Sequence, residues 1–242
     1  MIVLHSVSKD VGKGALKRRV LSGIDWEIPP RSHVVVLGHT GSGKSLLLSL
    51  IAGLSTPTHG WVERIAVVSL PGGVLRFGNH ETLRGLIHRM SEVYRADPQQ
   101  IVDFVVLFPP IREILDVHIN RLRGVIRAQL NAALNFAFPC DYYLFDGNTA
   151  PGRDPAFRQF CHEAFAVRRA QAATIVTANS VKIARGLDYN ASGAVLFQGK
   201  LHFYKTLPEA IVVFEKLPAD VASPRYRDPG SSQKDEEEYE LL

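Results

Sequence analysis

The stretch that decides the fold is Gly38-His39-Thr40-Gly41-Ser42-Gly43-Lys44-Ser45, a glycine-rich loop that ends in a lysine and a serine. Its spacing matches the pattern G-x-x-x-x-G-K-[ST] at every fixed position. The glycines let successive backbone N–H groups turn toward an anion, and a helix that follows such a loop adds its positive end. The sequence therefore predicts that this loop binds the phosphates of a nucleoside triphosphate.

The segments on either side of the loop provide the context that this motif requires. Residues 33–37 (HVVVL) form a short apolar run, which suits a strand buried on both faces. The apolar stretch from Leu46 to Leu54 predicts a helix that is closed by Gly53 and Pro57. A strand before the loop and a helix after it make a merely structural glycine turn a poor explanation.

The predicted ligands are ATP and Mg²⁺. Lys44 is expected to reach the β- and γ-phosphates, and the Ser45 hydroxyl is expected to ligate Mg²⁺. A second Mg²⁺ ligand is expected from Asp146, at the end of the apolar run DYYLFD. The residues expected to contact the nucleotide are Gly38, His39, Thr40, Gly41, Ser42, Gly43, Lys44, Ser45 and Leu46. Of these, His39 stands at a variable position and is assigned backbone contacts only.

The composition is that of an ordinary globular protein, with 46% hydrophobic and 21% charged residues in 242. The net charge of +4 includes an acidic end, because residues 233–242 hold one lysine and five acidic residues. No apolar run approaches the ~20 residues that span a bilayer, and the first residues do not form a signal peptide. We therefore expect a cytoplasmic protein that reaches the membrane only through a partner. Two cysteines, Cys140 and Cys161, suggest neither a disulfide framework nor a zinc site.

The order of predicted elements is that of an α/β core interrupted by helices. Two strands, within 2–7 and 20–28, precede the loop, and residues 9–19 between them are expected to form a connecting loop. From Glu81 to about Phe136 the pattern is helical, with Leu83, Leu86, Ile87 and Met90 on one face. Strands and helices then alternate: strands at 61–70, 142–145 and 174–177, a hairpin at 194–204, and helices at 155–169 and 208–216.

Two further stretches point to one protein family. Residues 54–60 (LSTPTHG) resemble the L-x-x-P-T-x-G segment of ABC transporter ATPases, and residues 148–154 (NTAPGRD) resemble their D-loop. Within that superfamily the chain looks most like the ATP-binding subunits of capsular-polysaccharide and O-antigen exporters. That narrower resemblance lies in residues 141–146, in the stretch from Thr149 to Cys161, and in residues 199–204 with the following helix.

The resemblance covers residues 1–217 and implies a fold, a partner and a location. It implies an α/β P-loop NTPase core of the ABC ATPase type, with an N-terminal antiparallel β subdomain and a helical insertion at about 81–137. Two such subunits, as a homodimer or as a heterodimer with a paralogous ATPase, would act on the inner face of the plasma membrane with an integral-membrane transporter subunit. Residues 218–242 are expected to be a disordered acidic tail.

The chain departs from the family at five positions. The Glu that polarises the attacking water is replaced by Gly147, and the His that contacts the γ-phosphate is replaced by Asn179. The Ser-Gly signature falls on residues 123–127 (RGVIR), and the Q-loop stretch 75–79 (LRFGN) holds no glutamine. Val11 stands where an aromatic residue stacks on adenine. These losses predict that the protein binds ATP with little or no hydrolysis, and they leave no residue assigned as catalytic.

Three alternatives remain beside an export subunit. The chain could be a nucleotide-gated regulatory or scaffold pseudo-ATPase that no longer serves transport. A small-molecule kinase is disfavoured, because such enzymes begin close to the strand before the loop. Nucleic-acid binding by Arg121, Arg123 and Arg127 is also disfavoured, because no aromatic residues are interleaved with them.

Overall fold

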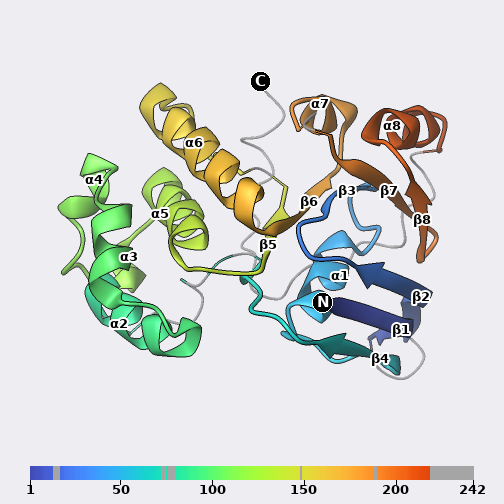
Figure 1. Cartoon of the computed structure of the whole chain (residues 1–242), viewed down its shortest axis with the longest axis horizontal. Coiled ribbons are helices and arrows are strands. Elements are labelled where there is room, and N and C mark those ends of the chain that lie inside the picture. Colours follow the sequence, from blue (N-terminus) through green and yellow to red (C-terminus); the bar gives the residue numbers. More distant parts are fainter. Residues whose placement is uncertain are drawn as a thin grey trace.

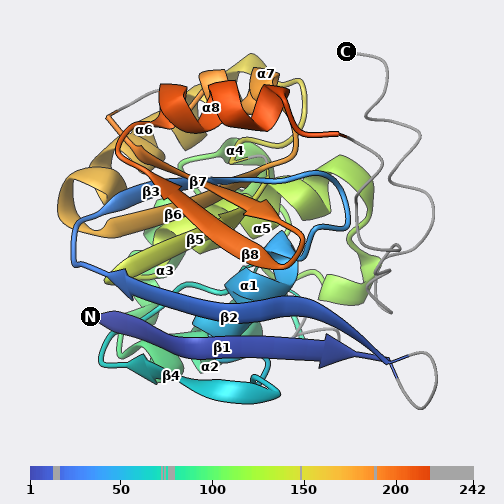
Figure 2. The ribbon, with the colours of Figure 1, turned by 90° about the vertical axis from the view of Figure 1, so that its right-hand side faces the viewer.

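The computed structural model describes residues 1–12, 17–71, 73, 75, 80–147, 149–187 and 190–218. Within these residues it contains two sheets, one of three strands in the order β2-β1-β4 and one of five in the order β5-β6-β3-β7-β8. Figure 2 shows helix α1 (Lys44–Ile51) between the two sheets, with α7 (Val181–Arg185) and α8 (Leu207–Glu215) beyond the five-stranded sheet. The protein therefore consists of stacked layers around the helix that follows the glycine-rich loop.

The three-stranded sheet is antiparallel and is built from β1 (Ile2–Val11), β2 (Arg18–Ile28) and β4 (His59–Arg64). The prediction of a loop over residues 9–19 was wrong at both ends, because Lys9 pairs with Leu21 and Asp10 with Arg19. Register shifts along this pairing interrupt the apolar alternation, and so the sequence pattern fades while the strands continue.

The five-stranded sheet carries the strands that the sequence predicted around the glycine-rich loop. Its parallel strands are β3 (His33–Leu37), β5 (Tyr142–Asp146), β6 (Ala173–Ala178) and β7 (Ser192–Phe197), and β8 (Lys200–Tyr204) is antiparallel to β7. Every residue of β6 is buried, as expected for a strand covered on both faces. All four parallel strands end at one edge, which places the turns that follow them side by side.

The predicted helical insertion is present and lies to one side of the sheets (Figure 1). It contains α2 (Leu83–Tyr94), α3 (Pro98–Val105), α4 (Pro109–Arg112), a 3-10 turn (Ile119–Arg121) and α5 (Gly124–Ala137). The predicted apolar face of α2 is fully buried, and so are Ile101, Val102 and Val105 of α3. These side chains join one large core with α5 and with α6 (Pro155–Gln171).

Side-chain caps explain where several of the helices begin. Thr82, Asp97, Asp154, Ser180 and Thr206 each accept a hydrogen bond from a backbone N–H in the first turn of α2, α3, α6, α7 and α8 respectively. None of the helices within the described residues is both long enough and apolar enough to cross a bilayer. The predicted acidic tail begins at Pro218, which is exposed. Its remaining residues, 219–242, lie outside the described part of the chain.

Candidate functional site

The glycine-rich loop connects β3 to α1 at the carboxyl edge of the five-stranded sheet. Gly41 and Gly43 have φ angles of 82° and 103°, which only glycine adopts without strain. A Cβ atom on Gly38 would lie 2.9 Å from the carbonyl oxygen of Leu196 on β7, so the loop also needs glycine to pass close to the sheet. Steric constraints in this structure therefore explain why the motif has glycine at its fixed positions.

Lys44 is the first residue of α1 and points back over the loop. Its Nζ donates hydrogen bonds to the carbonyl oxygens of Gly38 at 2.7 Å and of His39 at 3.0 Å. Only 8% of the residue is exposed, and this burial lowers the pKa of its ammonium from 10.5 to about 8. The charge of Asp146 acts in the opposite direction. The two charged residues that the sequence assigned to the site therefore lie close enough to interact.

Asp146 is held at the same level of the sheet by strand register. It pairs with Thr177 of β6, and Val36 of β3 pairs with the same threonine from the other side. The Thr177 hydroxyl donates a 2.7 Å hydrogen bond to Asp146 Oδ1 and accepts one of 3.0 Å from the Gly147 amide. This network fixes the carboxylate beside the start of the glycine-rich loop, although Asp146 itself remains exposed.

The oxygen donors at this edge fit a magnesium ion. Ser45 and Thr40 are exposed, and a carboxylate with a neighbouring hydroxyl is the ligand type that Mg²⁺ takes when nucleotide phosphates complete its coordination. Lys44 and the backbone N–H groups of the loop offer positive charge to the phosphates themselves. The arrangement thus suits a nucleotide with a bound divalent ion.

Two of the five positions that depart from the family pattern lie at the same edge. Gly147 follows Asp146 directly, with a φ of 83° and open space where a Cβ would be. Asn179 is exposed and follows β6, immediately before the N-cap of α7. Neither residue has a side chain that accepts a proton near neutral pH. The chain therefore offers no general base at either position.

The other three departures lie on other elements or are only partly described. Arg123 is the N-cap of α5 and donates to the Leu122 carbonyl, while Arg127 donates to the carbonyl of Ile119. The Q-loop stretch is described only at Leu75, which is buried, because residues 76–79 lie outside the described residues. Val11 is the last residue of β1 and is half-buried.

A cavity of about 180 Å³ adjoins Asp146 on the side of the helical insertion. Its wall includes Asn131 and Asn135 of α5 and Thr149 of the loop after β5. Asn135 Nδ2 donates a 3.2 Å hydrogen bond to the carbonyl oxygen of Leu144, which ties α5 to β5. The cavity lies beside the predicted Mg²⁺ ligand and has polar groups among the residues that line it, so we count it as part of the same site.

Two residues of this region were not found from the sequence. Thr177 was predicted only as part of a strand, and its role depends on register with β5, which apolar patterning does not reveal. Phe214 of α8 was predicted only as part of a helix, yet its ring lies 4.7 Å from the ring of His39 in the glycine-rich loop. A link between the last helix and the loop has no local sequence signal.

Comparisons with known proteins agree with this geometry. Residues 21–108 match the family model of the ABC transporter domain. The polysialic acid transport ATP-binding protein KpsT of Escherichia coli is 28% identical over 89% of this chain and 99% of its own length. The capsule polysaccharide export ATP-binding protein CtrD of Neisseria meningitidis is 27% identical over 90% of this chain and all of its own.

Among solved structures, the dimeric ATP-binding cassette MJ0796, bound to ADP and Pi in a post-hydrolysis state, has a similar fold. The TM-score is 0.71 at 16% identity, and the match covers 86% of this chain and 99% of the cassette. The fold is thus that of an ABC ATPase cassette. Residues 21–108 match the ABC transporter domain, and the chain resembles, over most of its length, the ATP-binding proteins of capsule polysaccharide export.

Proposed function

We propose that this protein is the ATP-binding subunit of a polysaccharide export system of the capsule or O-antigen type. The observation that carries the proposal is that Lys44, held over the glycine-rich loop, and Asp146 lie close enough to interact electrostatically at one edge of the sheet. Similarity to KpsT and CtrD over nearly the full length of those proteins supports the transported class. Residues 1–217 would form the ATP-binding domain, and residues 218–242 a tail.

In this proposal the residues 38–46 hold the nucleotide, and Ser45 and Asp146 hold Mg²⁺. The metal would neutralise charge on the phosphate oxygens. Lys44 would give up its hydrogen bonds to the loop carbonyls and donate to the β- and γ-phosphates. Thr177 would keep the carboxylate of Asp146 oriented through its 2.7 Å hydrogen bond.

We further propose that hydrolysis is weak or absent. A general base contributes typically 10²–10⁴ in rate, and Gly147 has no side chain to act as one. Asn179 can donate a hydrogen bond but does not titrate near neutral pH. Conformational change driven by ATP binding would then be the main output of this subunit, which would work as a dimer beside an integral-membrane partner.

The test combines ATP binding by calorimetry with phosphate release on the same purified sample. The expected result is Mg²⁺-dependent binding that Lys44→Ala abolishes, with phosphate release below the ~1 s⁻¹ usual for enzymes. Release at or above that rate, abolished by Lys44→Ala, would refute the proposed loss of hydrolysis. Absence of Lys44-dependent binding would refute the proposed function as a whole.

A second candidate is a nucleotide-gated regulatory or scaffold protein that has left transport. The combined departures at Gly147 and Asn179 favour it, because a subunit that does not hydrolyse ATP cannot drive a transport cycle of its own. Co-purification separates the two. An export subunit is retained by its integral-membrane partner in detergent, whereas the regulatory protein remains in the soluble fraction.

A further inference from the structure

The last helix of the described chain contacts the glycine-rich loop directly. Phe214 of α8 is 5% exposed, and its ring lies 4.7 Å from that of His39 at an interplanar angle of 33°. The Nε2 atom of His39 is buried and has no hydrogen-bond partner within the described residues. The ring of Phe214 therefore packs against a side chain whose Nε2 has no hydrogen bond within the described residues.

Residue 39 matters to the loop through its backbone carbonyl. That oxygen accepts hydrogen bonds from Lys44 Nζ at 3.0 Å and from the Ser42 amide at 3.1 Å. A shift of His39 moves the acceptor of both donors, which are groups proposed to face the nucleotide phosphates. Phe214 is thus separated from Lys44 by a single residue.

Helix α8 packs closely on β7, and this packing fixes the position of Phe214. A Cβ atom added to Gly193 of β7 would lie 2.3 Å from the Cβ of Ala210, which shows how closely the helix sits on the strand. The amide of Leu207 also donates to the carbonyl of Ala191 at 3.0 Å. The first turns of α8 are therefore held against β7, and the last turn carries Phe214 to the loop.

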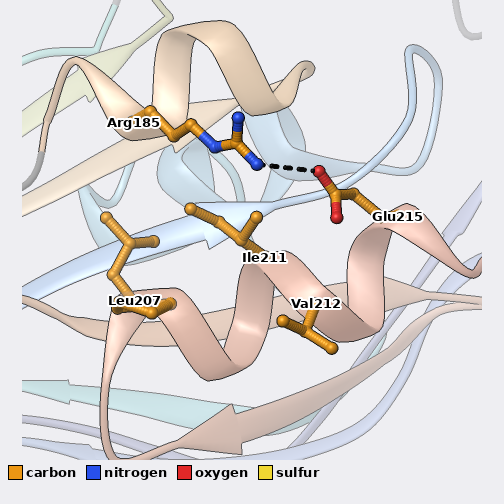
Figure 3. A pocket seen from close by; sticks show the side chains of 6 residues that line it. Arg185, Leu207, Ile211, Val212 and Glu215 are labelled. Atoms are coloured by element: carbon orange, nitrogen blue, oxygen red, sulfur yellow. Dashed lines mark hydrogen bonds and ion pairs between the residues drawn. The ribbon is translucent and has the colours of Figure 1, made fainter.

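The other side of α8 faces a groove that it shares with α7 (Figure 3). This cavity of about 330 Å³ is lined by Ile211 and Val212 of α8, and an ion pair of 3.2 Å between Arg185 and Glu215 joins the two helices. Both partners of that pair are exposed, so it adds little stability of its own. Helix α7 begins just after Asn179, and α8 contacts the glycine-rich loop through Phe214. Both helices are therefore connected to the sheet edge that carries the proposed nucleotide site.

We propose that Phe214 is a positioning residue for the nucleotide phosphates, acting through its contact with His39. In this role the ring of Phe214 keeps residue 39 in place, and the carbonyl of residue 39 holds the Ser42 amide and, until the nucleotide binds, Lys44. The inference rests on the proposed function, because it requires that the loop binds a nucleotide. It goes beyond that function by assigning control of the site to the C-terminal helix.

The experiment measures ATP affinity by calorimetry for a set of variants. Phe214→Ala and His39→Ala are each expected to weaken binding about 2- to 10-fold, the range that one aromatic pair supplies. The double variant should bind no more weakly than either single one, because both remove the same contact. Phe214→Tyr keeps a ring in place and is expected to remain within about twofold of the unmodified protein.

The matched control is Ile211→Ala, which removes a side chain of similar burial from the part of the same helix that lines the groove with α7. It should lower the melting temperature as Phe214→Ala does while leaving ATP affinity unchanged. If Phe214→Ala prevents folding, Phe214→Leu retains the apolar packing and lacks only the ring. Melting curves for every variant report whether the fold is intact.

Any of three results overturns the inference while leaving the proposed function standing. One is that Phe214→Leu and His39→Ala, both folded, bind ATP as tightly as the unmodified protein does. Another is additive losses in the double variant, which would mean that the two residues act independently. The third is loss of binding in Ile211→Ala equal to that in Phe214→Ala. If the unmodified protein shows no Lys44-dependent binding, the proposed function itself has failed.

Discussion

Replacing Lys44 by methionine is expected to stabilise the protein while it abolishes ATP binding. The change keeps the length of the side chain and removes its charge. Burial lowers the pKa of the Lys44 ammonium from 10.5 to about 8, so the folded protein disfavours the charged form that is present at pH 7. That difference corresponds to about 3 kcal/mol, at 1.36 kcal/mol for each pH unit.

Part of this gain is offset by a lost hydrogen bond. The carbonyl oxygen of Gly38 loses its ammonium donor, at a cost of about 1 kcal/mol, while the carbonyl of His39 still accepts from the Ser42 amide. The net expectation is a stabilisation of about 2 kcal/mol at pH 7. For a chain of this size the melting temperature should rise by about 4–8 °C.

The sign of the pH dependence provides the sharper test. With a pKa near 8 in the folded state and 10.5 in the unfolded state, the unfolded chain binds more protons between those values. The stability of the unmodified protein therefore rises through that interval, and Lys44→Met lacks this rise. The advantage of the variant should be full below pH 8 and should shrink toward pH 10.5.

Urea unfolding at pH 7 and pH 10 measures both quantities, with Lys205→Met as the control at an exposed lysine. Added Mg²⁺-ATP should stabilise the unmodified protein and leave Lys44→Met unchanged. An advantage for Lys44→Met that is equal at the two pH values would refute the argument. So would a variant less stable than the unmodified protein at pH 7.

Three further changes test other parts of the site. Thr177→Val removes the hydroxyl that orients Asp146 and should weaken Mg²⁺-ATP binding about fivefold in calorimetry, as expected for one hydrogen bond of about 1 kcal/mol; an unchanged affinity would contradict the orienting role. Gly147→Glu meets no steric obstacle but places a side chain at a φ of 83°, so stability should fall by about 1 kcal/mol. Phosphate release by that variant should increase by about 10²-fold if a base is what is missing, and no increase would locate the defect elsewhere. Gly193→Ala should destabilise by about 1–3 kcal/mol in urea unfolding, because its methyl group would lie 2.3 Å from the Cβ of Ala210; an unaffected midpoint would contradict the close seating of α8.

The parts of the fold that the sequence predicted well are those with strong local signals. The strands β3, β5 and β6 are short apolar runs buried on both faces, and α2 shows its apolar face at helical spacing. The ends of β1 and β2 were missed because Lys9 and Asp10 are polar and are held in the sheet by pairing with the neighbouring strand. Cross-strand pairing has no counterpart in a single segment of sequence.

The candidate site divides in the same way. The motif identified the glycine-rich loop and Lys44, and the acidic end of an apolar run identified Asp146. Thr177 was not found, because its partner depends on the register between β5 and β6. The contact between Phe214 and His39 was not found either, since it joins two residues that are far apart in the sequence. Residues that position others are revealed by topology and not by motif.

In the proposed function, binding and hydrolysis depend on physically separate parts of this site. Binding rests on the loop backbone, whose shape is fixed by Gly41 and Gly43, and on Lys44, which two carbonyl groups hold in place. Hydrolysis would require one side chain after β5 and another after β6, where the chain has Gly147 and Asn179. Both positions are on turns at the sheet edge, outside the glycine-rich loop itself. A protein can therefore lose hydrolysis here and still respond to ATP through the loop and the helix that contacts it.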